Sequence, residues 1–194
     1  MKSHKLFLAV LATLATAGCA HPMNIKPDIQ ALEPVSGRIQ KNVGLYISPA
    51  QRALEVTTAG GGGDKVKYHP YADMETGLYK ALSNVFAEVA LLTSPDDANA
   101  ISKHSLSYVV EPTINTTSSS SGVFTWMATD VTVQVTCKVL DIKGGLLASV
   151  AATGIGKADS SEVRSDFSIA GERASRDALQ KLETAFLEAP ELRK

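Results

Sequence analysis

The stretch Val131-Thr132-Val133-Gln134-Val135-Thr136-Cys137-Lys138-Val139 decides the fold class of this 194-residue chain. Apolar and polar residues alternate strictly along it, which gives the segment one apolar and one polar face. This pattern is typical of an antiparallel strand that packs on a core with one face and meets solvent with the other. Cys137 falls on the apolar side, so we interpret it as a small core residue; the alternative is a reactive thiol.

Further strands are predicted on both sides of this stretch. Short alternating runs end there at turn residues such as Ser48-Pro49 and Asp141-Ile142-Lys143-Gly144-Gly145. The Gly-rich residues 59–64 separate two such runs and predict a hairpin, and the Ser-rich residues 116–122 predict a flexible connection. The expected strands cover residues 43–47, 53–58, 65–69, 106–114, 123–127, 130–140 and 146–155.

Two long segments change to the helical period. Residues 71–91 place one set of apolar side chains on a single face: Met74, Leu78, Leu82, Val85, Phe86 and Val89. Residues 169–187 do the same with Ala170, Ala174, Ala178, Leu182, Ala185 and Phe186. A short helical turn is expected at 94–101, and residues 158–167 are expected to be irregular. Because two helices cannot cover both faces of such a sheet, we predict a two-layer α+β domain. Its mostly antiparallel sheet carries two main helices on one face.

The N-terminus has the features of an export signal. Lys2 and Lys5 precede a ten-residue apolar run, residues 6–15, which is far shorter than the ~20 residues that span a bilayer. The run closes on Ala17-Gly18-Cys19, which resembles the lipobox of bacterial lipoproteins, although Thr16 stands where Leu, Val or Ile is commoner. In that family the cysteine is acylated and becomes the first mature residue. The alternative is a plain secretory signal with an incidental cysteine.

The lipoprotein resemblance implies a division of the chain. Residues 1–18 would be the signal peptide, 19–40 the lipidated cysteine and a tether, and 41–194 a single periplasmic α+β domain. Pro22, Pro27 and Pro34 predict an extended tether, able to hold the domain up to roughly 60 Å from the bilayer. The alternative is that part of this segment lies along the domain as an edge strand. By resemblance to lipoprotein sorting in enteric bacteria, Ala20 after the cysteine implies the outer membrane.

Charge and composition restrict the partners. Without Lys2 and Lys5 the mature chain has 17 basic and 20 acidic residues, a net charge near −3. It shows no basic block, which argues against nucleic acid. The expected partners are the membrane, through acyl chains on Cys19, and an envelope protein.

The motifs of catalysis and cofactor binding are missing from the sequence. Residues 60–66 superficially suggest a phosphate loop, but Asp64 and Val66 occupy the places that need Gly and a hydroxyl residue. His21, His69 and His104 do not show metal-ligand spacing, and no nucleophile elbow is present. We therefore expect no enzyme activity, no cofactor and no metal.

Phe124 and Trp126 are candidate contact residues. In an unbroken strand they would lie opposite the odd-numbered core set of residues 131–139, as an exposed aromatic pair beside a flexible loop. Such a pair would suit a protein partner or the membrane. The alternative is a bulge near Ala128-Thr129 that turns both rings into the core.

Softer patterns resemble a group of uncharacterised bacterial lipoproteins. They are residues 43–47, the helical segment ending at 85–89, and residues 177–182 with 189–192. At fold level the order of elements is similar to envelope accessory lipoproteins, such as those of polysaccharide and curli export and the activators of cell-wall synthases. The resemblance implies a non-catalytic, lipid-anchored scaffold or accessory subunit of an outer-membrane assembly or export system. The alternative function is a lipid- or glycan-binding lipoprotein, which would need a deep apolar cavity between sheet and helices.

Overall fold

Three 12-residue strands form the centre of the structure. The computed structural model describes residues 20–120 and 127–194, and in it the alternating stretch lies within β7 (Asp130–Asp141). β7 pairs antiparallel with β6 (Tyr108–Ser119) on one side and with β8 (Leu146–Lys157) on the other. Its odd-numbered side chains are buried and its even-numbered ones face outward, as the alternation predicts.

The sheet continues past β6 with parallel pairs. The strand order is β5-β2-β6-β7-β8, in which β2 (Ile39–Leu45) runs parallel to both β6 and β5 (Phe86–Leu91). The α+β class is confirmed, but the sheet is mixed. Its long antiparallel half was predicted from alternation, and its parallel half was not.

A second, smaller sheet lies beside the end of β6. Its order is β1-β4-β3, with β1 at Ala20–Pro22, β3 at Val56–Ala59 and β4 at Lys65–Tyr68. β3 and β4 form the predicted hairpin around the Gly-rich residues. β1 pairs parallel to β4 as an edge strand.

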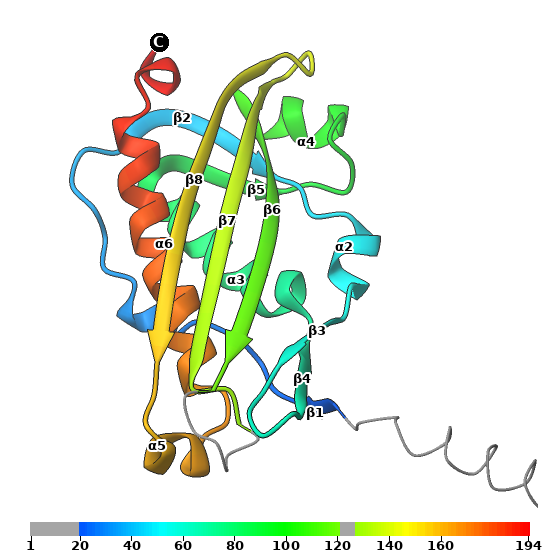
Figure 1. The fold of residues 1–194 in the computed structure, drawn as a ribbon. Coiled ribbons are helices and arrows are strands. Elements are labelled where there is room, and N and C mark those ends of the chain that lie inside the picture. Colours follow the sequence, from blue (N-terminus) through cyan, green and yellow to red (C-terminus); the bar gives the residue numbers. More distant parts are fainter. Residues whose placement is uncertain (1–19, 121–126) are drawn as a thin grey trace, which may run out of the picture.

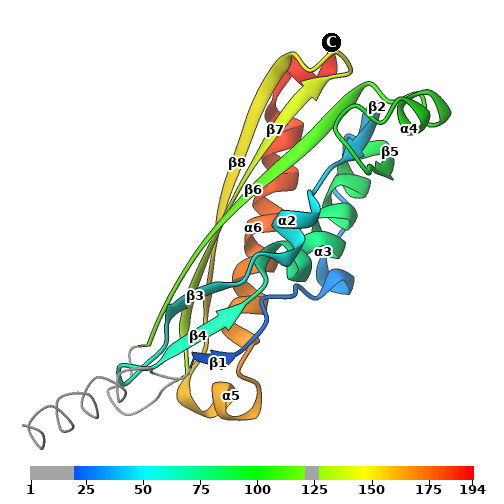
Figure 2. The same cartoon turned by 90° about the vertical axis from the view of Figure 1, so that its right-hand side faces the viewer.

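The two long helices, α3 and α6, cover one face of the larger sheet (Figure 1). On the other face, α4 and the residues around Leu92 and Leu106 pack over β5, β2 and the start of β6 as a smaller apolar cluster, while β7 presents polar side chains outward. A view turned by 90° shows an elongated domain, with β1 and α5 at one end and the C-terminus at the other (Figure 2). The helices are α2 (Pro49–Ala53), α3 (Pro70–Val85), α4 (Ala98–Lys103), α5 (Ser160–Ser165) and α6 (Ile169–Glu188), with 3₁₀ turns η2 (Ile29–Ala31) and η3 (Pro190–Arg193).

The helix predicted over residues 71–91 is shorter than expected. It ends at Val85, and the six residues from Phe86 to Leu91 are extended and form β5. The helical spacing of apolar residues continues in the sequence past Val85, because the buried and exposed residues of β5 do not alternate. The β2–β5 pairing also shifts register between Ile39 and Asn42. The period therefore could not distinguish the strand from more helix.

The tether predicted over residues 19–40 is wrong for its described part, and the edge-strand alternative is right. Ile25 is fully buried and Leu32 nearly so, both within the main core. The backbone N–H of Ile25 donates to Asp73 Oδ2 on α3 at 3.1 Å, and that of Asn24 donates to Ser168 Oγ at 3.2 Å. The domain therefore begins by Ala20 and includes the whole segment.

Smaller differences come from local capping. The expected irregular segment 158–167 contains α5, which begins with a capping box between Asp159 and Glu162. Ser48, which the sequence predicted only as a turn residue after a strand, is the N-cap of α2 and forms another capping box. Asp97, and not Ser94, caps the short helix α4. The Ser-rich segment is strand as far as Ser119.

The core matches the predicted helix faces. Leu78 and Leu82 on α3 and Leu182 on α6 are fully buried, and so is Cys137 on β7. Phe86 and Phe186 meet edge to face with ring centroids 5.5 Å apart, which ties the start of β5 to the end of α6. Cys137 lies fully buried in the main core, so the core interpretation is confirmed, and this burial raises the pKa of its thiol to about 12.

The backbone of α6 lies directly on β8. A Cβ atom added to Gly154 would overlap backbone atoms of Ala174 and Ala178, and one added to Gly156 would overlap those of Ala170 and Ala174. The three alanines are one turn apart on α6 and fully buried. Small residues on both sides therefore allow an approach that side chains of ordinary size would prevent.

Side chains of α6 also close the outer edge of β8. Arg173 donates to the carbonyl of Lys157 at 2.7 Å, and Asp177 accepts the N–H of Ile155 at 2.9 Å. One turn further on, Lys181 donates to the carbonyl two residues before Ile155 at 3.2 Å. Edge strands expose unpaired backbone groups that invite pairing with other chains, and here the helix occupies them.

The first prediction concerns this contact. Gly156→Ala should lower the free energy of unfolding by about 1–3 kcal/mol or more, because the added methyl group must push α6 away from β8. Denaturant unfolding measures the effect. Ala151→Val, on the exposed face of the same strand, is the matched control and should change stability by less than about 0.5 kcal/mol. Equal stability of the two variants would contradict the close packing.

Candidate functional site

Several elements that are distant in the sequence meet at one end of the domain (Figures 1 and 2). They are β1, the tip of the β3–β4 hairpin at residues 60–64, the paired ends of β6 and β7, and α5 with the turn that leads into α6. We call this the N-terminal end, since Ala20 lies in it. It is the candidate functional site because the predicted lipidation residue comes immediately before Ala20.

Strand β1 fixes the first described residues to the domain. Ala20 stands opposite Lys65 in the β1–β4 pairing. The two strands are parallel, and their pairing extends as far as Pro22 opposite Lys67. The N–H of Met23 then donates to the carbonyl of Lys67 at 3.0 Å. Position 20 is therefore part of a paired strand, with no free linker between it and the sheet.

A cluster of hydroxyl groups joins the small sheet to β6. Tyr68 OH donates to Thr116 Oγ1 at 2.8 Å, and Thr58 Oγ1 lies 2.5 Å from Ser118 Oγ. Ser118 Oγ also donates to the carbonyl of Ala59 at 2.5 Å. Through these bonds the hairpin, and with it β1, is held beside the last residues of β6.

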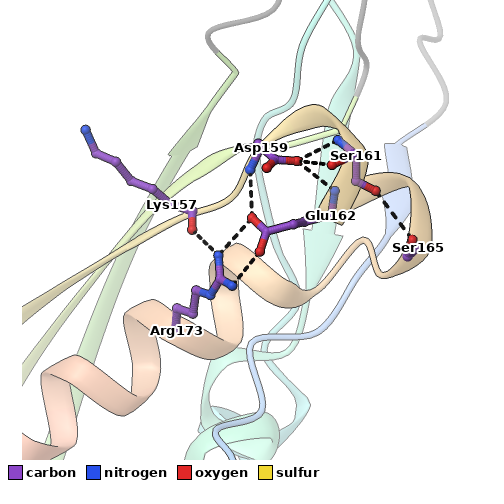
Figure 3. A network of polar contacts seen from close by, with 6 residues as sticks. All are labelled: Lys157, Asp159, Ser161, Glu162, Ser165 and Arg173. Atoms are coloured by element: carbon purple, nitrogen blue, oxygen red, sulfur yellow. Dashed lines mark hydrogen bonds and ion pairs between the residues drawn. The ribbon is translucent and has the colours of Figure 1, made fainter.

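A polar network fixes α5 to the other elements (Figure 3). The Asp159 carboxylate accepts the N–H groups of Ser161 and Glu162 at 2.7 and 2.9 Å, while its own N–H donates to Glu162 Oε2 at 3.0 Å. Arg173 on α6 bonds both oxygens of Glu162, at 2.7 and 3.1 Å, as well as the carbonyl of Lys157. One guanidinium thus joins α5, α6 and β8.

The electrostatics of this network suit a structural role. The bond from Arg173 is the main cause that lowers the pKa of Glu162, and the Ser161 hydroxyl is the main cause for Asp159. Both carboxylates therefore remain ionised as acceptors at neutral pH, where a general acid would need a raised pKa.

A hollow of about 420 Å³ opens beside the first residues of the domain. It is lined by Pro22, Met23 and Asn24 on one side and by residues 165–168 of the α5–α6 turn on the other. Phe167 in this turn is 42% exposed. Apolar side chains of Pro22, Met23 and Phe167 thus line this hollow beside the first described residues.

The three residues predicted from the sequence, Cys19, Phe124 and Trp126, lie outside the described residues. Their described neighbours are all at the N-terminal end. Ser119 pairs with Asp130, and the N–H of Thr129 donates to the carbonyl of Ser119 at 3.0 Å, so both flanks of residues 121–126 are fixed there. The tertiary structure therefore brings positions 20, 120 and 127 to one end of the molecule, which the sequence did not indicate.

The described residues show little that could carry catalysis or bind a metal. Within residues 20–120 and 127–194, no cluster of His, Cys, Asp and Glu has the arrangement of a metal site. Each described histidine lies beside a carboxylate: His21 near Asp64 at 3.5 Å, His69 near Glu55 at 3.8 Å and His104 near Glu88 at 2.6 Å. None of the helices in the same part of the chain has both the length and the apolar character needed to cross a membrane.

Comparisons with known proteins give likenesses of fold at low identity. No family model and no curated protein matches the chain. A DUF330-family protein from Xanthomonas campestris is 16% identical with a TM-score of 0.43, and 87% of this chain and 91% of that one are covered. A PelC dodecamer from Paraburkholderia phytofirmans is 16% identical with a TM-score of 0.42, and the shares covered are 78% and 94%.

A third structure, a Caulobacter crescentus protein described as a candidate lipoprotein, is 15% identical with a TM-score of 0.33. The match covers 69% of this chain and 86% of the Caulobacter chain. At these identities and TM-scores the neighbours assign neither a family nor a function to this chain.

One buried carboxyl lies away from the N-terminal end, between the two long helices. Glu183 on α6 is 1% exposed, and its Oε1 accepts the side-chain amide of Asn84 on α3 at 2.8 Å. Its Oε2 is buried without a hydrogen-bond partner. Burial raises the pKa of Glu183, because the charged form loses solvation that one amide does not replace.

The second prediction follows from this raised pKa. Between the ordinary Glu pKa of about 4.3 and the higher folded value, the folded state binds more protons, so rising pH lowers stability. Glu183→Gln should therefore raise the free energy of unfolding at pH 7, with a gain that shrinks as the pH falls toward 4. Thermal melts across this range measure it. Glu188→Gln, exposed on the same helix, is the control. Parallel pH profiles for wild type and Glu183→Gln would contradict a raised pKa.

Proposed function

We propose that this chain is a lipid-anchored, non-catalytic envelope lipoprotein. It would face the periplasm from the outer membrane and act as a scaffold or accessory subunit of an assembly or export system. The observation that carries the proposal is the apolar run 6–15 closing on Ala17-Gly18-Cys19. Acyl chains on Cys19 would supply the anchor, since more than one chain is needed for stable attachment.

The described fold fits within the proposed mature chain. Ala20, which would be the second residue of a mature chain that begins at Cys19, is already paired in β1. Residues 20–32 are tied into both sheet and core, by the β1–β4 pairing and by buried Ile25 and Leu32. The proposed cleavage would therefore leave every described element in the mature protein.

The alternative function, a carrier of lipid or glycan, is less well supported. A carrier needs a deep apolar cavity between helices and sheet. Instead α6 contacts β8 so closely that a single Cβ at Gly154 or Gly156 would overlap its backbone. The hollow beside Pro22 and the one lined by residues 57–65 both lie around the small sheet at the N-terminal end.

The non-catalytic part of the proposal rests on the roles that the polar groups already have. Asp159, Glu162 and Arg173 fix α5, and the Cys137 thiol is buried with a pKa of about 12, far from a nucleophile's range.

Phe124 and Trp126 are proposed as contact residues of this lipoprotein. The end of β6 and the start of β7, which flank them, lie at the same end of the domain as β1 (Figure 1). An aromatic pair in this part of the sequence would be well placed to contact a membrane-associated partner.

The third prediction tests the anchor. Cys19→Ser should release the protein from the membrane fraction or leave it as an unprocessed precursor, because serine cannot form the thioether to lipid. Fractionation with mass spectrometry of the N-terminal peptide measures both results. Cys137→Ala removes the other cysteine and should stay in the membrane fraction. A processed Cys19→Ser protein that remains membrane-bound would contradict the proposal.

The fourth prediction tests the aromatic pair. Phe124→Glu combined with Trp126→Glu should leave the melting temperature nearly unchanged. In membranes treated with a chemical cross-linker, the wild-type protein should form a cross-link to its partner, and the double variant should not. The control is glutamate at Thr132 and Gln134 on the outward face of β7. Loss of folding in the aromatic variant would show that the two rings belong to the core.

A further inference from the structure

No linker residue separates the proposed anchor, Cys19, from the first paired residue of the domain, Ala20. Consecutive Cα atoms are 3.8 Å apart, so the Cys19 backbone lies within one residue of paired Ala20. A lipid attached to the Cys19 sulfur would therefore hold Ala20 at the bilayer surface. This step rests on the lipidation proposed above, and it replaces the long tether that the prolines suggested.

Contacts on several sides restrain the segment that follows. β1 pairs with β4, and the bonds of Met23, Asn24 and Ile25 reach β4, the α5–α6 turn and α3 in succession. Because Ile25 is fully buried, the chain cannot leave the domain beyond this point without opening the core. The direction of the domain relative to its anchor is thus fixed by tertiary contacts.

The surface around Ala20 has a composition that suits the interface of a bilayer. Exposed Phe167 and Pro22 supply apolar contact beside the hollow. The exposed or half-exposed charges are of both signs, and they come from β4, β8, α5 and their flanks: Lys65, Lys157, Arg164, Asp64, Asp159 and Asp166. Such a surface needs no strongly anionic lipid, since the acyl chains would supply the affinity.

We propose that the N-terminal end is the surface by which the domain contacts the lipid bilayer, which we call its seat. In this arrangement Ala20, Pro22 and Phe167 lie at the headgroup level. Strands β6, β7 and β8 lead from the membrane to the opposite end (Figure 2). At about 3.4 Å per residue, the 12 residues of β7 span roughly 40 Å, so the β7–β8 turn is held far from the lipid. Exposed Ile142 and Leu146 at that turn face away from the membrane.

Site-specific fluorescence quenching tests the seat on the full lipidated protein. Arg164→Cys on α5 and Lys143→Cys in the β7–β8 turn are matched exposed positions for a thiol-reactive dye. The unsubstituted chain should take up no dye, because Cys137 is buried and the Cys19 sulfur would carry lipid. Each labelled protein is reconstituted into vesicles of phosphatidylethanolamine and phosphatidylglycerol that contain a lipid with a nitroxide on its headgroup.

The expected result is several-fold stronger quenching at position 164 than at 143. A flexible Gly-Ser segment of about ten residues inserted between Cys19 and Ala20 should bring the two values together, since such a linker spans about 17 Å on average. Equal quenching without the insertion, in protein whose acyl mass is verified, overturns the seat alone. An unmodified Cys19 that takes up dye overturns lipidation and the seat together. Quenching at 164 that the insertion leaves unchanged overturns the role given to β1.

Discussion

The contact between α6 and β8 is the constraint on which the rest of the structure depends. Gly154 and Gly156 expose strand backbone, and the alanine stripe of α6 allows the helix to lie directly on it. Dispersion and apolar burial are gained over the whole length of the contact, provided that no larger side chain intervenes. This geometry also brings the polar side of α6 to the edge of β8, where it bonds backbone groups that would otherwise be free.

The same helix organises the N-terminal end. Arg173 belongs both to the group that closes the β8 edge and to the network that fixes α5. Ser168, just before α6, accepts the N–H of Asn24 and so ties the first residues of the domain to this turn. A shift of α6 would therefore loosen β8, α5 and the segment after Ala20 together. The proposed anchor and the core are thus mechanically connected.

The proposed orientation on the membrane follows from these connections. Had the domain hung from a long tether, its surface could have met partners in any direction. With Ala20 paired in β1, the proposed anchor would place one end at the bilayer and the exposed apolar residues of the β7–β8 turn in the space beyond it. The domain would then have a fixed orientation relative to the membrane, which suits a scaffold or accessory subunit better than a mobile carrier.

Local patterns of the sequence determined the elements whose neighbours are close along the chain. Alternation in residues 131–139 predicted β7 and the buried position of Cys137, and the helical period predicted α6, since each pattern reports one face of one element. The lipobox resemblance likewise depends only on consecutive residues. The capping box at Asp159 was also local and could have predicted α5.

Only the tertiary structure decided the rest. Residues 86–91 became strand because β2, more than forty residues earlier, offered backbone partners, and their irregular burial hid this from any periodicity. Residues 20–32 joined the domain because β4, Asp73 and Ser168 accept them, although the prolines alone favour an extended chain. Hydrogen bonds between distant segments leave no periodic trace in the sequence of either one, so the parallel half of the sheet and the N-terminal end could be recognised only in the folded chain.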